Sequence, residues 1–243
     1  MPPGTAELPR LARLTPVLSA RHKTLMNTTA NRSYRWLFWT LALCGLILDQ
    51  GSKYGLFAGL YRDGQEVGEI TVIPNVFYLE TTYSRKEDDG QVFLSPLRQA
   101  NGPKLPNVNH GALWGIGGPS QEEPDSKGYN HIFAVVSIIA AIAIVFWSFR
   151  QTTAHDRWLC VALGLILAGT LGNLYDRVVF EGVRDFFKWV YLYRFPVFNV
   201  ADSCLVCGAS LLLLQAFFAS HDEQKSAATA QAASEEPMAA GVK

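Results

Sequence analysis

The chain has 243 residues, with 21 basic and 21 acidic side chains that give a formal net charge of zero. A nucleic-acid-binding surface needs an excess of Lys and Arg, so no nucleic-acid partner is predicted. Charged residues make up 17% of the sequence and apolar residues 49%, whereas a soluble domain has roughly 25% charged residues. The charges cluster near the two ends and in one middle segment, which argues against an ordinary soluble enzyme.

Four nearly uncharged runs have about the 20 residues that an α-helix needs to cross the hydrocarbon core of a bilayer. Core helices of a soluble bundle would carry a polar face with a period of about 3.6 residues, and the second and third runs have none. We therefore predict an all-α integral membrane protein with four transmembrane helices. The runs are Trp36–Leu48 with its continuation to residue 60, Ile132–Phe149, Trp158–Leu174 and Phe198–Phe218.

The segments outside these runs divide the chain into a membrane core and polar parts. Residues 34–218 form the predicted core, and residues 1–33 and 219–243 are polar extensions predicted to be disordered. Residues 61–131 separate the first two helices and are too long for a structureless loop. Within them, Glu69–Tyr83 alternates β-branched and aromatic residues. A small β-rich insertion between helices 1 and 2 is the prediction.

Basic residues beside the helices predict the orientation of the chain. Positive charges favour the cytoplasmic side, and they occur both before the first helix and in the short second connection, at Arg150 and Arg157. Both termini are then cytoplasmic, and the 61–131 insertion is extracytoplasmic. A basic stretch before an apolar run also resembles a cleaved signal peptide. No Ala-x-Ala-like site follows it, and Asp49 comes directly after the run.

The third connection is also basic, although this orientation places it outside. Its cations alternate with aromatic residues, a pattern typical of the membrane interface. They can therefore serve as site groups or as contacts to lipid headgroups. They are Arg177, Arg184, Lys188 and Arg194.

Polar residues gather near the predicted outer ends of all four helices. A charge inside a span costs roughly 2.5–3.5 kcal/mol, so such residues mark functional sites. Because neighbouring helices are antiparallel, these groups should meet at one depth and form one polar site. Its predicted members are Asp49, Lys53, Asn109, Gly111, Asn173, Asp176, Arg177, Asp185, Asn199 and Asp202.

Helical spacing predicts pairings among these residues. Asp49 and Lys53 stand at i and i+4 and can pair within one helix, an arrangement as compatible with a structural role as with a functional one. Asn173, Asp176 and Arg177 stand at i, i+3 and i+4. We expect Arg177 to neutralise a carboxylate there and Asn173 to donate a hydrogen bond.

Carboxylates outnumber cations in this site. Desolvation and neighbouring like charges both raise a carboxyl pKa, so at least one carboxyl is expected to be protonated at neutral pH. Two carboxyls that share one proton are the machinery of aspartic proteolysis. The ionised group takes a proton from water, and the protonated group polarises the scissile carbonyl. The four carboxylates are Asp49, Asp176, Asp185 and Asp202, set against Lys53 and Arg177.

Other chemistries have weaker support. The five His residues show no H-E-x-x-H spacing and there is no Cys/His tetrad, so no metal is predicted. There is no G-x-S-x-G elbow. Cys204-x-x-Cys207 is interpreted as packing because no basic residue nearby would lower a thiol pKa. Gly164, Ala168 and Gly172 have small-xxx-small spacing, which predicts close helix packing.

A proton-coupled carrier is the alternative function. Intramembrane Asp, Asn and Arg residues also mark ion pathways. The chain shows no internal repeat of the kind typical of transporters, and its polar groups do not extend to the inner side. A polar site that opens on one face suits an enzyme better than a conduit.

Five short blocks occur between residues 49 and 202. They are Asp49-Gln50-x-x-Lys53, Asn109-x-Gly111-Ala112-x-Trp114-Gly115, Gly172-Asn173-x-x-Asp176-Arg177, Val183-x-Asp185-Phe186 and Phe198-Asn199-x-Ala201-Asp202. In content and order these blocks resemble the lipoprotein signal peptidase (signal peptidase II) family. One departure is Glu181, which stands where that family often has Gly four residues after the Arg.

The resemblance implies an integral-membrane aspartic endopeptidase with Asp185 and Asp202 as its catalytic pair. The other block residues would bind substrate or support the site: Asp49, Lys53, Asn109, Gly111, Asn173, Asp176, Arg177 and Asn199. The implied substrate is a prolipoprotein whose Cys carries diacylglycerol, cut on the N-terminal side of that Cys.

The resemblance also implies the setting in which this chemistry takes place. The protein would be a multi-pass protein of the bacterial cytoplasmic (inner) membrane that contacts membrane lipid. Its active site would face the periplasm. No cofactor is implied, a monomer is expected, and globomycin is the family's characteristic inhibitor.

Overall fold

The computed structural model describes residues 32–62, 65–87, 93–99, 104–111, 129–193 and 195–235. Most of the predicted N-terminal extension at 1–33 lies outside these residues. So do Ala112, Trp114 and Gly115 of the second sequence block, and Arg194 of the third connection.

Four long helices follow the four predicted apolar runs. They are α2 (Arg35–Leu60), α4 (Asn130–Ser148), α6 (Arg157–Val179) and α7 (Val200–Glu235), with a short α5 (Gln151–His155) between α4 and α6. Three of them are long and apolar enough to cross a membrane: α4, α6 and the Val200–His221 part of α7. Helix α2 has 26 residues, but Asp49, Gln50 and Lys53 make its second half polar. That α2 is a fourth span therefore stays a prediction.

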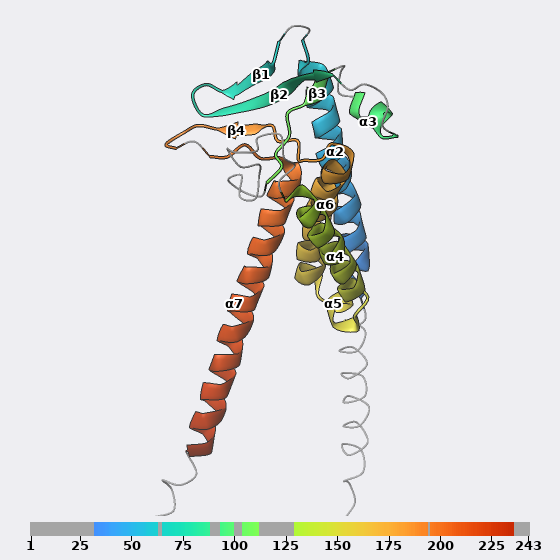
Figure 1. Cartoon of the computed structure of the whole chain (residues 1–243). Helices are drawn as coiled ribbons and strands as arrows, with labels where there is room; N and C mark the ends of the chain where they lie inside the picture. Colours follow the sequence, from blue (N-terminus) through green and yellow to red (C-terminus); the bar gives the residue numbers. More distant parts are fainter. Residues whose placement is uncertain are drawn as a thin grey trace, which may run out of the picture.

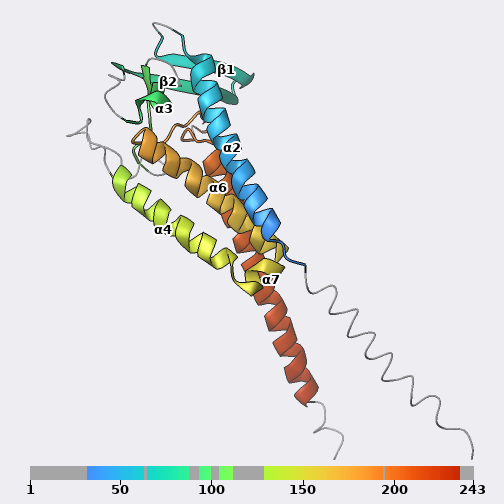
Figure 2. The ribbon, with the colours of Figure 1, turned by 90° about the vertical axis from the view of Figure 1, so that its right-hand side faces the viewer.

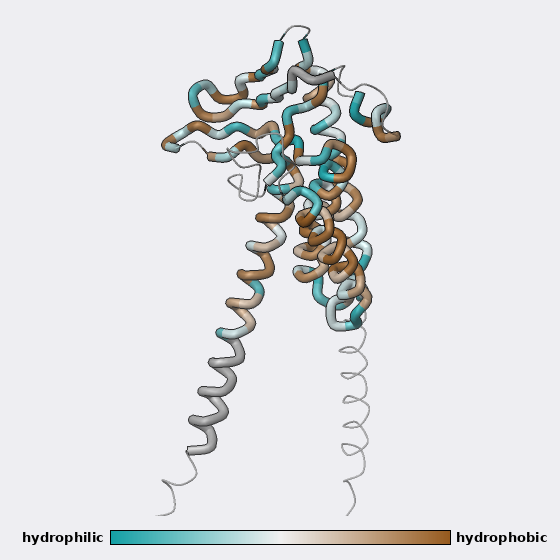
Figure 3. The backbone as a smooth tube through the Cα atoms, viewed as in Figure 1, coloured by the Kyte–Doolittle hydropathy of each residue, from teal (hydrophilic) through white to brown (hydrophobic). Residues whose placement is uncertain are grey.

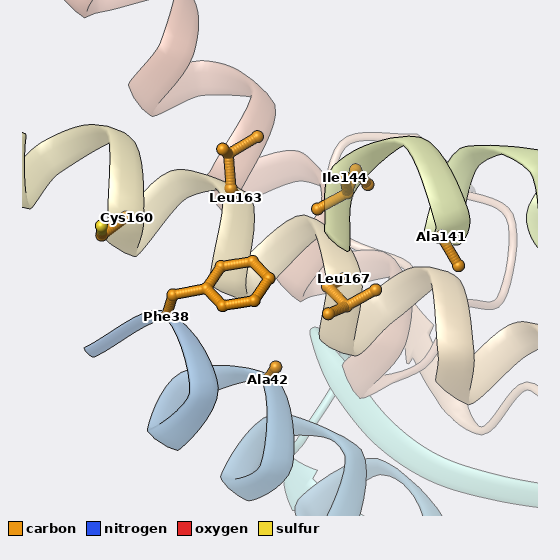
Figure 4. Packing of buried hydrophobic residues seen from close by; sticks show 7 residues of the cluster. All are labelled: Phe38, Ala42, Ala141, Ile144, Cys160, Leu163 and Leu167. Atoms are coloured by element: carbon orange, nitrogen blue, oxygen red, sulfur yellow. The ribbon is translucent and has the colours of Figure 1, made fainter. Parts of the chain in front are cut away.

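Helix α6 is the central helix, because α2, α4 and α7 all pack against it (Figure 2). Phe38 of α2 inserts between Leu163 and Leu167 of α6, and Ile144 of α4 completes this apolar cluster from the other side (Figure 4). The outward face of α4 is apolar and exposed, with Phe146 69% accessible. The helices are predominantly hydrophobic along their packed length (Figure 3), as a lipid surrounding requires.

Small residues bring α6 close to its neighbours. The predicted stripe of Gly164, Ala168 and Gly172 faces α2. A Cβ atom added at Gly164 would lie 2.8 Å from the carbonyl oxygen of Phe38, and one at Gly172 would lie 2.5 Å from Oδ2 of Asp49. The small-residue spacing is thus confirmed as a packing feature.

A four-stranded antiparallel sheet covers one end of the helices (Figure 1). Strands β1 (Val67–Ile73), β2 (Phe77–Glu87) and β3 (Lys104–Pro106), and the short helix α3 (Ser95–Gln99), belong to the predicted insertion. Strand β4 (Phe187–Trp189) comes from the connection between α6 and α7 and pairs with β2. The aromatic pattern of that connection had indicated only a membrane-interface segment. Pairing with β2 instead makes it part of the sheet.

The C-terminal boundary differs from the prediction. Residues 219–235, predicted to be disordered, continue α7 as helix to Glu235. This stretch is rich in Ala, Gln and Glu, which favour helix, and it contains no Gly or Pro. Pro237 follows two residues later, where a proline disfavours further helix.

Tight packing of α6 on α7 gives a first prediction. A Cβ atom at Gly169 would collide with the carbonyl oxygen of Ala201 and lie 2.6 Å from Cγ of Leu205. Gly169→Ala should therefore lower the free energy of unfolding by about 1–3 kcal/mol, because the helices must separate. The matched control is Gly55→Ala in α2, where nothing lies within 4 Å of the new Cβ.

The control variant should be neutral or up to about 1 kcal/mol more stable, because Ala favours helix over Gly. Thermal unfolding in detergent compares the two proteins. Equal midpoints for both variants would contradict the packing argument.

Candidate active site

The ten predicted site residues come together between the helices and the sheet. One network of hydrogen bonds and ion pairs connects all of them. The single polar site expected from the sequence is therefore confirmed as a structural unit.

A fully buried ion cluster lies on the helix side of this site. Nζ of Lys53 is 2.9 Å from Oδ2 of Asp49 and 3.2 Å from Oδ2 of Asp176, and all three side chains are inaccessible to solvent. The predicted pair of Asp49 and Lys53 is confirmed and extends to α6. Oδ1 of Asp49 also accepts the amide of Ala201 at 2.9 Å. The cluster thus fixes the first turn of α7 against α2 and α6.

Arg184 completes the cluster; the sequence indicated it only as one of four cations that could be site groups or headgroup contacts, and not as a member of the polar site. Its Nη2 and Nε lie 2.8 and 3.2 Å from Oδ1 and Oδ2 of Asp176, and its amide donates to Oδ2 at 2.9 Å. Nη2 also donates to Oε1 of Gln50 at 2.9 Å. The guanidinium lies 4.3 and 4.0 Å from the ring centres of Tyr54 and Phe180. A two-pronged, stacked arrangement of this kind requires Arg rather than Lys.

Arg177 does not make the contact that its spacing predicted. Its Nη1 donates to the carbonyl oxygen of Asn173 at 3.4 Å, and its guanidinium lies 5.5 Å from the ring centre of Phe133. Among the described residues it has no ion pair with a carboxylate, and its buried Nε has no hydrogen-bond partner. The reason is that Lys53 and Arg184 already surround Asp176.

Asn199 joins the two carboxylates proposed as a pair. Its side-chain amide donates to Oδ1 of Asp185 at 2.7 Å, and its backbone amide donates to Oδ2 of Asp202 at 3.1 Å. The amide of Asp202 in turn donates to Oδ1 of Asn199 at 3.0 Å. These reciprocal bonds form a capping box at the start of α7. Asn173 donates to the remaining oxygen of Asp202 at 2.8 Å.

Asp185 lies in the connection between α6 and α7, outside the apolar helices. Asn109 donates to its Oδ2 at 3.3 Å, while the amide of Gly111 donates to Oδ1 of Asn109 at 2.9 Å and orients that side chain. Removal of the carboxyl group from water, together with the charge of Asp202, raises the pKa of Asp185 to about 7. The predicted protonation of one carboxyl near neutral pH is consistent with this pKa.

A cavity of about 330 Å³ opens at Asp185. Its walls come from three parts of the chain: β2, the segment after β3, and the connection between α6 and α7. The volume is at the small end of the roughly 300–1,000 Å³ typical of ligand pockets. The described residues include no group of three or more His, Cys, Asp or Glu side chains placed to hold a metal ion.

The turn after α6 forms although Glu181 stands where the family that the chain resembles often has Gly. Glu181 has a φ of 62°, a region that costs a residue with a side chain on the order of 1 kcal/mol. Nδ1 of His110 lies 2.8 Å from its carbonyl oxygen, and Nη2 of Arg98 lies 3.6 Å from its carboxylate. These contacts hold the turn, and Asp185 still reaches the site.

The buried cluster predicts a large effect of Arg184→Met on stability. Loss of the guanidinium leaves Asp176 buried with Lys53 alone, and breaking a buried ion pair from one side costs about 3–5 kcal/mol. The exposed Arg150 provides the control, and Arg150→Met should stay within about 0.5 kcal/mol of the parent. Chemical unfolding in detergent measures both values. A change below about 1 kcal/mol for Arg184→Met would overturn the structural role of the cluster.

The chain is similar in sequence to known proteins of one family. The family model of signal peptidase (SPase) II matches residues 105–218. The lipoprotein signal peptidase of Rhodopirellula baltica is 35% identical over 195 residues, which cover 74% of this chain and 71% of that protein. The lipoprotein signal peptidase of Pseudomonas syringae pv. tomato is 32% identical over 198 residues, with 80% and 91% covered.

Two solved structures of bacterial membrane enzymes are also similar to the chain. One is 26% identical with a TM-score of 0.55 and covers 75% of this chain and 88% of its own. The other is 27% identical with a TM-score of 0.54 and covers 76% and 96%. Sequence identity above 30% over most of the length of a curated relative confirms the resemblance, and the chain belongs to the lipoprotein signal peptidase (signal peptidase II) family.

Proposed function

We propose that this protein is a membrane aspartic endopeptidase that removes the signal peptide from diacylglyceryl-modified prolipoproteins. Membership of the signal peptidase II family supports the substrate class. The observation that carries the mechanism is Asn199, which bonds to both Asp185 and Asp202, and Asp185 lines a cavity. Cleavage takes place on the N-terminal side of the lipidated Cys.

The two carboxyls divide the work of peptide hydrolysis between them. The ionised carboxylate takes a proton from a water molecule, whose oxygen attacks the scissile carbonyl carbon. The protonated carboxyl gives its proton to the carbonyl oxygen, so the tetrahedral intermediate is neutral. When the C–N bond breaks, the first carboxyl passes its proton to the leaving nitrogen, and the gem-diol returns a proton to the second. The pair ends with one shared proton, as it began.

The neighbouring polar groups hold this pair and its substrate. Asn109, Asn173 and Asn199 donate to the two carboxylates and fix their orientation. Arg177 has a buried Nε with no partner among the described residues, so it is available to a substrate carbonyl. Asp49, Lys53 and Asp176 belong to the buried ion cluster and act as support.

The setting follows from the helices and from the positive charges beside them. Helices α2, α4, α6 and α7 span the inner membrane, with both termini in the cytoplasm and the sheet in the periplasm. The carboxyl pair then lies at the outer interface. A lipidated Cys can reach it there while its acyl chains remain in the bilayer. The chain acts as a monomer with no cofactor.

Substitution of either catalytic carboxyl tests the proposal directly. Asp185→Asn and Asp202→Asn should each reduce cleavage of a diacylglyceryl-modified prolipoprotein by at least about a hundredfold, because general acid–base catalysis is lost. The purified proteins are assayed in detergent by gel mobility, with globomycin as the inhibitor control.

Asp156→Asn is the matched control variant. Asp156 caps the opposite end of α6 through the amides of Trp158 and Leu159, and Asn caps helices as well as Asp does. Its activity should equal that of the parent. Retained turnover in Asp185→Asn or Asp202→Asn would refute the two-carboxyl mechanism.

The raised pKa of Asp185 predicts the pH dependence of this activity. Above about pH 7 the carboxyl of Asp185 loses its proton, and it can no longer act as the acid for the carbonyl. The ratio kcat/KM should therefore fall as pH rises through about 7. The hydrogen bond from Asn109 lowers the pKa of Asp185, so Asn109→Ala should move this fall to higher pH.

Asn107→Ala is the control for this shift, because Asn107 lines the same cavity and no side-chain bond joins it to Asp185 among the described residues. In Asn107→Ala the fall of kcat/KM should occur at the same pH as in the parent. An equal shift of this pH in both variants would argue against the role of Asn109 in setting the pKa of Asp185.

A further inference from the structure

The edge of β2 that borders the cavity is paired at both ends and open between them. The amide of Glu80 donates to the carbonyl oxygen of Phe186 at 2.9 Å, at the β4 end. The carbonyl oxygen of Thr82 accepts the amide of Asn107 at 2.8 Å, at the β3 end. Phe186 gives its own amide to Phe198 and not to Glu80, and no bond from the amide of Thr82 to the described segment after β3 is formed. The carbonyl of Glu80 and the amide of Thr82 thus remain open between these bonds on this side of β2.

Both open groups lie on the side of β2 that faces away from β1. In an antiparallel pair, alternate residues direct their amides and carbonyls to the same neighbour. The amide of Tyr83 donates to the carbonyl oxygen of Glu66 at 2.9 Å, on the β1 side. By this alternation Thr81 also directs its main-chain groups toward β1. The main-chain groups of Glu80 and Thr82 therefore face away from β1. Glu80 and Thr82 both line the cavity, next to Asp185.

A free carbonyl and a free amide on two residues that flank a third can pair with two residues of an antiparallel strand or with a single residue of a parallel strand. The groups beyond them on this edge are already bonded, so the single-residue parallel mode is the one considered. One residue of an added strand then donates its own amide to the first group and accepts the second at its own carbonyl. Peptides bind to open sheet edges through such main-chain bonds. We call the open stretch of the β2 edge between the bonds at Glu80 and Thr82 the gap. Because only these two groups are open, the gap can pair with one residue of a parallel strand. Unpaired main-chain groups that border a cavity favour such an occupant.

We propose that this gap binds the main chain of the substrate on the mature side of the cleavage site. One residue running parallel to β2 donates to the carbonyl of Glu80 and accepts from the amide of Thr82. This inference rests on the proposed function, because it places the occupant beside the catalytic Asp185.

The mature side is chosen from the position of the sheet. The sheet lies at the end of the helices, beyond the start of α7 (Figure 1). The apolar signal segment of a prolipoprotein lies beside the helices in the bilayer, and the mature chain leaves the membrane past the sheet. Val108, Val183 and Val197 give the cavity an apolar wall, which suits a small or apolar side chain at the bound position.

Substrates with single main-chain changes test the gap without any change to the protein. In synthetic diacylglyceryl peptides, one amide at a time is N-methylated, at positions on both sides of the cut but not at the scissile amide. We expect one position on the mature side, within a few residues of the lipidated Cys, to raise KM about tenfold or more. This corresponds to the loss of about 1.4 kcal/mol of binding. The value of kcat should change little.

An ester at the sensitive position is the control for the bulk of the methyl group. It removes the same N–H without adding an atom, so it should reproduce the rise in KM. Thr82→Pro removes the donor on the protein side and should raise KM for the unmodified peptide. Its folding is checked by thermal unfolding, and the substrate scan decides the matter if this variant does not fold.

The outcomes separate this inference from the function on which it rests. Cleavage of the parent peptide with a flat scan overturns the main-chain site and leaves the peptidase intact. A single sensitive position on the signal-peptide side overturns the assignment to the mature chain. Failure to cleave the parent peptide overturns both proposals.

Discussion

The rest of this structure depends on the ion pairs that neutralise one buried carboxylate, Asp176. Asp176 lies in α6 without solvent contact and is surrounded by Lys53 from α2 and Arg184 from the connection before α7. A charge removed from water is tolerated only with partners of this kind. The ion pairs of Asp176 therefore fix three elements relative to one another: α2, α6 and the connection before α7. The site residues are carried on these same elements, which fixes their relative positions.

The start of α7 uses the same hydrogen bonds for folding and for the site. A helix N-terminus leaves amides without partners, and Asn199 and Asp202 satisfy two of them reciprocally. Asp49 accepts a third amide, that of Ala201. The side-chain amide of Asn199 is left to hold Asp185. One capping box thus ends the connection, begins the helix and brings the second carboxyl to the first.

Spacing within a helix could be read from the sequence, whereas contacts across a turn could not. The long apolar runs located the helices, and the i, i+4 pair of Asp49 and Lys53 formed as expected. Arg177 was expected to neutralise a carboxylate near it in the helix, but the Arg that pairs with Asp176 is Arg184, which follows the turn at Glu181. Periodicity contains no information on such a partner. The three-residue β4 was missed for the same reason, since its identity as a strand depends on β2.

The direction of Asp185 depends on its two neighbours in the sequence. In an extended segment, successive side chains point to opposite sides. Arg184 and Phe186 are 0% and 1% accessible, the first in the ion cluster and the second in the apolar cluster with Phe57 and Tyr83. With both neighbours buried, Asp185 is directed to the cavity. A slip of one residue would exchange the two sides and bury the carboxyl among apolar groups. Arg184 therefore acts on Asp185 through register, without any contact between their side chains being required.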